Sequence, residues 1–272
     1  MENRGKFRMK RFQLSDARCG CKIGVDGTLI GSWAPISPDA VRALDAGCGC
    51  ALIAMMIAQR NPALNVTAID VNEDALLDAS QNVAESIFAD RIEVRNCALD
   101  SLLAELDEGR FDLIVSNPPF FESGIDPAGS ARMLARHAGT LSPESLIRAA
   151  RTLLTPRGAL AFIAPASYIR KYLGIARECE LHPEKICFVK GHPGADCKRV
   201  MLYLTRSDSC GVIGEGSTLA KTCPEEINAG EIQKKINQKT KRCRIGHLII
   251  RDKTGNYTHE YKTLGKDFYL KF

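Results

Sequence analysis

Short apolar runs and helical patterns alternate along the first two hundred residues of the chain. Residues 51–58 are almost wholly apolar, and residues 73–86 repeat apolar side chains at helical spacing behind Asn72, a favourable N-cap. A further helix is predicted to begin at Ser142-Pro143, because serine caps helices and proline suits the first helical position. Apolar, β-branched runs that predict strands occupy residues 40–44, 65–70, 91–95, 111–116 and 158–164.

Strands that alternate with helices predict βαβ units, in which parallel strands share one sheet and helices cover both faces. Residues 186–189 and 200–204 form two more apolar runs. The segment between them is too short for a crossover helix, so these two strands should pair antiparallel. The pattern therefore predicts an α/β, Rossmann-like fold with a seven-stranded, mostly parallel sheet and an antiparallel last strand.

The composition is that of an ordinary soluble globular protein, with 45% apolar and 25% charged residues among 272. The formal net charge of +5 permits an anionic partner without requiring one. No apolar run is long enough to span a membrane, and residues 1–12 lack the apolar core of a signal peptide. We therefore expect a cytoplasmic protein with no membrane partner.

The chain contains eleven cysteines, an odd and unusually large number. Residues 19–21 and 48–50 are both Cys-Gly-Cys, with one residue between the thiols. Structural zinc sites usually have about two to four residues there. We expect buried, reduced thiols and no metal site.

The N-terminal residues 1–22 are basic, and Phe7 and Phe12 interleave with the charges. Lysine and arginine neutralise phosphates and aromatic rings stack on bases, so the segment suits a nucleic-acid-binding arm. A frayed, solvated terminus has the same composition, and composition alone favours that interpretation. The glycine-punctuated residues 22–31 that follow indicate a close backbone approach, either to a ligand or within a tight turn.

An apolar strand over residues 111–115 ends in Asn117-Pro118-Pro119-Phe120. Proline removes N–H donors, so carbonyl oxygens here can point outward as acceptors, beside the carboxamide of Asn117 and the ring of Phe120. Two acceptors and a flat apolar face could hold a planar amino group and direct its lone pair, with no general base needed before attack. The alternative is that the tetrapeptide only stops a strand and forms a loop. On these residues alone the two hypotheses are level.

A glycine turn, Asp45-x-Gly47-x-Gly49, follows the first predicted strand, and Asp70 ends the second. This layout suits a nucleotide cofactor whose ribose hydroxyls an acid can bind. A dinucleotide fingerprint needs a third glycine where Leu52 stands, and an acid before the turn would repel a pyrophosphate. S-adenosylmethionine, with an ammonium group and no phosphate, fits better than NAD. Its adenine could lie at Cys97-Ala98, after the third strand.

Residues 122–140 show little periodicity and carry Arg132, Arg136 and His137. A loop of this length in a compact domain is often functional. A buried structural histidine is a slightly better interpretation of His137 than a catalytic one. Residues 206–244 are rich in Ser, Gly, Glu and Lys, which predicts a flexible insert or linker.

These motifs together resemble a class I S-adenosylmethionine-dependent methyltransferase of the type that methylates amino groups through Asn-Pro-Pro-Phe/Tyr. More narrowly, the chain resembles the bacterial tRNA(Val) adenine-37 N6-methyltransferase family over nearly its whole length. The Asn-Pro-Pro motif alone also occurs in enzymes that act on glutamine amides, guanine N2 and DNA adenine. The segments that carry the narrower resemblance are residues 22–34, 45–49, 112–121, 135–137, 257–261 and 267–270.

The resemblance implies methyl transfer to the N6 amino group of an adenine in the anticodon loop of a tRNA, with no metal. The alternatives are another amino-group substrate (rRNA guanine N2, DNA adenine or protein glutamine) or a non-catalytic RNA-binding module. The implied catalytic residues are Asn117, Pro118 and Phe120. The implied cofactor-binding residues are Asp26, Asp45, Gly47, Gly49, Asp70, Val71, Cys97, Ala98 and Asn117. The implied RNA-binding residues are Lys10, Arg11, Arg132, Arg136 and His137.

The chain departs from this family at several positions near the cofactor, and Cys48 and Cys50 stand where the family tends to have threonine. Ala51 stands where a third glycine is usual, which matters only if that position needs a positive φ. Val25 replaces a threonine beside Asp26. We divide the chain into a basic segment leading into the cofactor site (1–35), a methyltransferase domain (36–205), the insert (206–244) and a C-terminal strand and tail that pack on the core (245–272).

Overall fold

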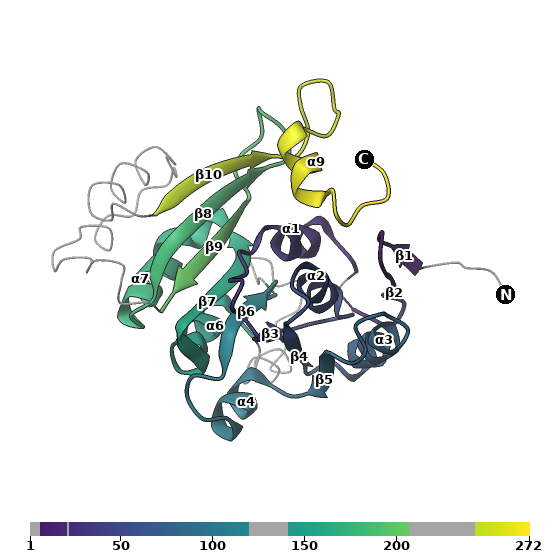
Figure 1. Cartoon of the computed structure of the whole chain (residues 1–272). Helices are drawn as coiled ribbons and strands as arrows, with labels where there is room; N and C mark the ends of the chain where they lie inside the picture. The colour runs from purple at the N-terminus through teal and green to yellow at the C-terminus, as the bar shows by residue number, and fades with distance from the viewer. Residues whose placement is uncertain (1–5, 21, 120–140, 207–242) are drawn as a thin grey trace, which may run out of the picture.

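The structure is a computed structural model that describes residues 6–20, 22–119, 141–206 and 243–272 (Figure 1). A sheet of eight strands runs through the molecule. In order across this sheet, the strands are β10 (Arg244–Ile249), β8 (His182–Lys190), β9 (Arg199–Thr205), β7 (Leu154–Pro165), β6 (Phe111–Ser116), β3 (Arg42–Ala46), β4 (Asn65–Asp70) and β5 (Ile92–Asn96).

Neighbouring strands are parallel everywhere except at β9, which is antiparallel to both β7 and β8. The predicted mostly parallel sheet is therefore confirmed, as is the antiparallel pairing of residues 186–189 with residues 200–204, where Ile186 pairs with Leu202. The predicted count of seven is wrong by one strand. β10 joins the edge at β8 in parallel, and its largely exposed side chains give a weak apolar signal in the sequence.

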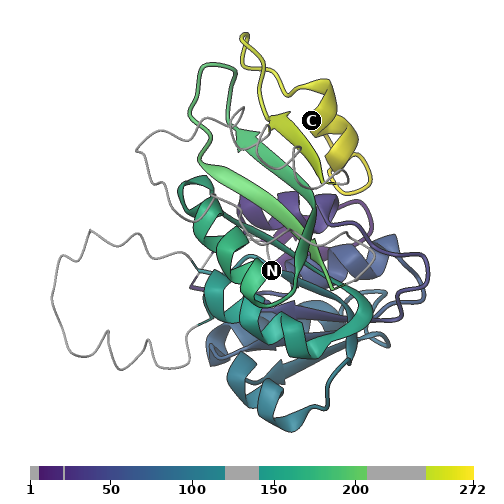
Figure 2. The ribbon, with the colours of Figure 1, turned by 90° about the vertical axis from the view of Figure 1, so that its left-hand side faces the viewer.

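Helices cover both faces of the sheet, and each face has its own apolar core (Figures 1 and 2). Alternation along the strands sends Ala43, Leu113 and Val115 to one core and Leu44 and Ile114 to the other. The first core includes α1 (Val25–Trp33), α2 (Leu52–Arg60) and α3 (Glu73–Ala84), and the second includes α4 (Leu99–Glu105), α6 (Pro143–Leu153), η1 (Ala166–Tyr168) and α7 (Ile169–Glu178).

The glycine-punctuated segment after residue 22 forms α1, so the predicted tight turn is wrong, and the approach to a ligand stays a prediction. The glycines allow α1 to pack closely on α2. A Cβ atom on Gly31 would lie 2.8 Å from Sδ of Met56, and one on Gly27 would lie 3.2 Å from Cδ2 of Leu52. The cost of glycine within a helix is offset here by contact between the two helices.

The N-terminal segment is ordered where the structure describes it, so the frayed-terminus interpretation is wrong for residues 6–20. Strands β1 (Lys6–Arg8) and β2 (Gln13–Ser15) form an antiparallel hairpin. Phe12 is buried and its ring contacts Phe88 edge to face, with 6.0 Å between centroids. Phe12 therefore serves the core and is not available to stack on a base.

The two ends of the described chain meet beside α1 (Figure 1). Helix α9 (His259–Gly265) contacts α1, and the hydroxyl of Tyr269 donates to Oγ1 of Thr28 at 2.8 Å. Met9 forms a bridge with Tyr269, and the backbone N–H of Lys10 donates to the carbonyl of Phe268. No helix in the described residues is long and apolar enough to cross a membrane. The predicted insert over 206–244 lies almost wholly outside the described residues.

Candidate active site

The carboxyl ends of β3, β4 and β6 meet at one edge of the sheet, and they carry the residues that the sequence singled out. Asp45 of β3 lies in register with Ala68 of β4 and Val115 of β6. The hydroxyl of Ser116 donates to the carbonyl of Ala46 at 2.6 Å, which ties the ends of β6 and β3 together. Topology thus brings residues 45–49, 70 and 117 to one place.

The turn after β3 needs a left-handed backbone at three alternate positions. The φ angles of Gly47, Gly49 and Ala51 are 71°, 53° and 65°. Ala51 therefore does occupy a position that favours glycine, at a cost of about 1 kcal/mol. The backbone N–H groups of Gly47 and Cys48 both donate to the carbonyl of Ile69, which fixes the turn against the end of β4.

Asp70 links this turn to the next helix. Its Oδ2 accepts from the N–H of Gly49 at 2.8 Å, and its Oδ1 accepts from the N–H of Asn72 at 2.9 Å. Beside Asp70 lies a small cavity of about 40 Å³. Five predicted cofactor residues meet in its lining, which consists of Gly47, Ile69, Asp70, Val71, Cys97, Ala98, Leu99 and Leu141.

Leu141 and Val71 are two of the apolar residues that line this cavity. A Cβ atom on Gly47 would lie only 2.6 Å from Cδ2 of Leu141, so the leucine covers the glycine turn closely. Val71 has 58% of its surface exposed, which is high for a valine, and it follows directly after the acid at the end of β4. An exposed apolar side chain thus lies beside Asp70 at this face of the cavity.

Asp45 is a buried carboxyl group that is only partly satisfied. Its Oδ2 accepts from the N–H of Ala54 at 2.9 Å, whereas its Oδ1 has no hydrogen-bond partner among the described residues. Burial raises the pKa of Asp45 from its ordinary value of 3.8 to about 7; the Ala54 hydrogen bond lowers it, and the nearby charge of Asp70 raises it. A cation placed at Oδ1 would stabilise the ionised form.

Asn117 follows β6 directly and presents a second unmet acceptor. Its Oδ1 is buried and has no hydrogen-bond partner among the described residues. By strand alternation Asn117 faces the same side of the sheet as Val115 and Asp45, towards α1 and α2. Pro118 is buried and Pro119 is exposed. The cluster ends the strand, as the structural hypothesis requires, but it also leaves an acceptor that no described residue satisfies.

The other predicted site residues do not line this cavity, and some of them lie outside the described residues. Asp26, at the start of α1, forms an ion pair with Arg199 of β9, with 2.8 Å between Oδ2 and Nε, and sequence reasoning missed this arginine. Nζ of Lys10 donates to the carbonyl of Lys266, and Arg11 is exposed. The remaining predicted residues outside the described ranges are Phe120, Arg132, Arg136 and His137.

Most of the cysteines in the described residues are buried. Burial raises the pKa of Cys50 to about 12, with the neighbouring Cys19 raising it further, so this thiol is protonated and unreactive near neutral pH. Within the described ranges no group of three or more His, Cys, Asp or Glu side chains is arranged to hold a metal ion.

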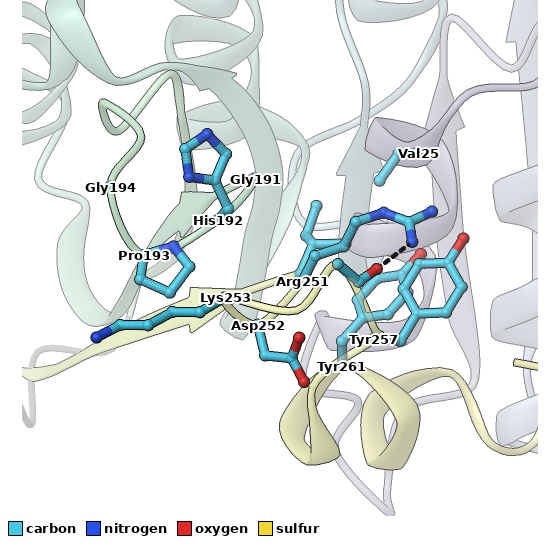
Figure 3. Close-up of a pocket in the computed structure, with 12 residues that line it drawn as sticks. Val25, Gly191, His192, Pro193, Gly194, Arg251, Asp252, Lys253, Tyr257 and Tyr261 are labelled. Carbon is cyan, nitrogen blue, oxygen red and sulfur yellow. Dashed lines mark hydrogen bonds between the residues drawn. The ribbon is translucent and has the colours of Figure 1, made fainter.

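A second, larger hollow of about 750 Å³ opens at the other end of the same sheet edge (Figure 3). It is lined by the turn after β8, by the segment after β10 and by α9, with Val25 of α1 at one side. Sequence reasoning missed these residues because they come from three segments far apart in the chain.

Comparison with known proteins agrees with this geometry. The family model of the methyltransferase small domain matches residues 35–171. A solved structure described as a predicted O-methyltransferase of Agrobacterium tumefaciens has the same fold, with a TM-score of 0.61, 18% identity, and coverage of 89% of this chain and 96% of that chain. Fold and site together define a methyltransferase of the Rossmann-like class.

Curated relatives narrow the family further. The tRNA1(Val) (adenine(37)-N6)-methyltransferase of Parabacteroides distasonis is 34% identical over 97% of this chain and 98% of its own length. The protein of the same name from Trichodesmium erythraeum is 35% identical over 98% of both chains. The chain belongs to the family of tRNA1(Val) (adenine(37)-N6)-methyltransferases, so the resemblance seen in the sequence is confirmed.

Proposed function

We propose that this protein transfers a methyl group from S-adenosylmethionine to the N6 amino group of adenine 37 in a valine tRNA. Relatives of that name match almost the whole chain, which supports the substrate. The observation that carries the chemistry is the buried Oδ1 of Asn117 at the carboxyl end of β6, which has no hydrogen-bond partner among the described residues. No metal is needed for this reaction, and tRNA modification of this kind suits a cytoplasmic enzyme.

The residues at the edge fit the cofactor in chemical type. Oδ1 of Asp45 is a buried acceptor with no partner in the described part of the chain, which suits the ammonium of the methionine portion. Asp70 retains further lone pairs for ribose hydroxyls, and the cavity at Val71, Cys97 and Ala98 offers an apolar wall for adenine. When bound, the cofactor supplies an electrophilic methyl group on a sulfonium.

The protein's part in the transfer is to hold and orient the target nitrogen. The lone pair of an adenine amino group is delocalised into the ring, so it is a poor nucleophile. Oδ1 of Asn117 and the carbonyl of Pro118 accept the two N6 hydrogens, which favours the pyramidal nitrogen with its lone pair free. The attack therefore needs orientation and placed dipoles rather than a general base beforehand. Phe120 stacks on the base in this proposal.

An anticodon loop suits such a pocket because its bases are unpaired, so turning one of them outward costs little. Basic side chains at Lys10, Arg11, Arg132, Arg136 and His137 contact phosphates in this proposal, together with the insert at 206–244. Affinity for tRNA should therefore fall as the salt concentration rises.

Transfer of label from radioactive cofactor to purified substrates tests the proposal. We expect label in a valine tRNA transcript, and none in a transcript with purine at position 37, which lacks only the amino group. Label as methylguanosine in rRNA, in DNA, or in protein would replace the proposed substrate with one of the other amino groups. Binding of tRNA without any label would leave a non-catalytic RNA-binding protein.

A further inference from the structure

The larger hollow at the β8–β10 end of the sheet is not explained by cofactor binding or by the target amino group. Its walls are the turn at His192, the segment from Arg251 to Gly255, and the side chains of Tyr257 and Tyr261. Figure 3 shows His192 and Pro193 on one side of the hollow, facing Arg251 and the tyrosines on the other. A volume of about 750 Å³ is within the usual range of ligand pockets, roughly 300–1,000 Å³.

One wall is a preformed flat surface that carries positive charge. The guanidinium of Arg251 lies 4.2 Å from the ring centroid of Tyr257, and its Nη1 donates to the carbonyl of Gly255 at 2.7 Å. The side chain is therefore held in place while remaining exposed. Planar guanidinium and aromatic groups both stack on nucleobases.

The charges around the hollow favour an anionic ligand. Arg251 and Lys253 in its lining are exposed cations. The lining also contains one acid, Asp252, whose Oδ1 accepts hydrogen bonds from the backbone N–H and hydroxyl of Thr254 and from the N–H of Asn256. One oxygen of this carboxylate is thus occupied by donors of its own loop.

The hollow shares the sheet edge with Asn117. β8 and β10 run parallel to β6, so their carboxyl ends, which lead into His192 and Arg251, point to the edge that carries Asn117. β8 lies three strands from β6, which corresponds to roughly 14 Å at ordinary strand spacing. Val25 lines the hollow beside Asp26 of the ion pair with Arg199, so the start of α1 lies between the two places.

We infer that this hollow is a second nucleotide subsite, which takes an unpaired nucleotide of the same RNA loop that presents the target adenine. Its base stacks on the Arg251–Tyr257 surface opposite His192, and its phosphate lies near Lys253. The inference rests on the proposed function and deepens it. An RNA loop held at two points along one edge fixes which base reaches Asn117.

Kinetics on an anticodon stem-loop, with matched variants, test the subsite. Arg251→Ala and His192→Ala should raise KM for the stem-loop about tenfold each, with kcat and cofactor affinity close to wild type. The controls are Arg157→Ala and His259→Ala, which alter exposed residues of the same types outside the lining. Melting temperatures verify that all four variants fold. Equal KM values for lining and control variants would overturn the subsite.

Abasic stem-loops identify the bound nucleotide. An abasic residue near position 37 that removes the stacked base should weaken wild-type binding about tenfold and weaken Arg251→Ala little further. If every abasic residue weakened binding by wild type and by Arg251→Ala equally, Arg251 would contact no base. That result would overturn the subsite. A wild-type enzyme that methylates no stem-loop and no tRNA would instead overturn the proposed function, and the tRNA subsite with it.

Discussion

The molecule contains two pairs of buried aspartate and asparagine oxygens in opposite situations. At the carboxyl edge, Asp45 and Asn117 each have an oxygen without a partner among the described residues. On α3, Asp78 and Asn82 are buried and fully engaged with the N-terminal segment. The same residue types thus hold the fold together in one region and leave oxygens without a described partner in the other.

The α3 pair fastens residues 15–19 to the domain. Asp78 accepts from the backbone N–H groups of Arg18 and Cys19 and from Nη1 of Arg18, at 2.7–3.1 Å. Asn82 exchanges hydrogen bonds in both directions with the backbone of Ser15 and donates to the carbonyl of Cys50 in the glycine turn. Both oxygens of Asp78 and both the oxygen and the nitrogen of the Asn82 amide are therefore hydrogen-bonded.

The oxygens at the carboxyl edge that have no described partner lower the stability of the ligand-free protein. Burying an unpaired polar group costs about 1–3 kcal/mol, so a ligand that supplies the missing donor recovers it. Gln59 and His182 also carry one buried atom each without a partner among the described residues. An unmet atom alone therefore does not define a site; Asp45 and Asn117 differ in lying at the edge where the parallel strands end.

Breaking the α3 pair should give the largest loss of stability. Asp78→Ala leaves two backbone N–H groups and the Arg18 guanidinium without their carboxylate, and should lower the free energy of unfolding by about 3 kcal/mol. Chemical denaturation measures this, with Ser80→Ala, an exposed position of the same helix, as the control. A loss equal to that of the control would show that the N-terminal segment does not depend on Asp78.

Asn117→Ala, in contrast, should slow the reaction and leave the stability of the protein nearly unchanged. The rate of methyl transfer should fall about a hundredfold, as for removal of an oxyanion-hole donor, while stability and cofactor affinity change little. Single-turnover rates of folded protein provide the measurement. Asn82→Ala is the counterpart: it should lower stability and leave the rate per folded molecule near wild type. A near wild-type rate for Asn117→Ala would mean that the active site is misplaced.

Cofactor affinity should depend on pH through Asp45. Burial raises the pKa of Asp45 to about 7, so below that pH the carboxyl must release a proton before it can pair with an ammonium. Affinity should fall up to tenfold per pH unit from pH 7 to pH 5. Calorimetric titration at several pH values checks this, and Asp45→Asn should bind weakly with no such slope. An equal slope in the variant would assign the proton to another group.

The smallest expected effect is on the stability of the cofactor-free protein. The pKa of Asp45 is higher in the folded state than in the unfolded state, so the folded state binds more protons between about pH 4 and pH 7. The contribution of Asp45 to the free energy of unfolding therefore falls as pH rises through that range and is constant above it. Asp45→Asn removes that penalty and should gain about 2 kcal/mol over wild type at pH 8, and less at pH 5. A gain that does not change with pH would contradict the assignment.

Local patterns predicted the residues of the edge but not how they are held. Strands, helices and the spacing from Asp45 to Asp70 follow from short-range periodicity, which a sequence displays directly. The ion pair of Asp26 with Arg199 and the hollow between His192 and Arg251 join segments that only the folded sheet brings together. The glycines of α1 led to the wrong prediction of a tight turn. In a sequence, a glycine that permits helix packing cannot be distinguished from one that needs a positive φ.

The contact between the two ends of the described chain can form only after both ends have been synthesised. α1 leaves the ribosome before Tyr269, whose hydroxyl donates to Thr28 across a sequence separation of 241 residues. Domains generally fold as units during or after synthesis, so this side of α1 stays open to solvent until Tyr269 has been made. A chain stopped before residue 257 would hold every predicted cofactor-binding residue yet lack the tyrosine wall of the larger hollow. Truncated products should therefore retain the predicted cofactor residues while losing the part of the RNA affinity that the larger hollow contributes.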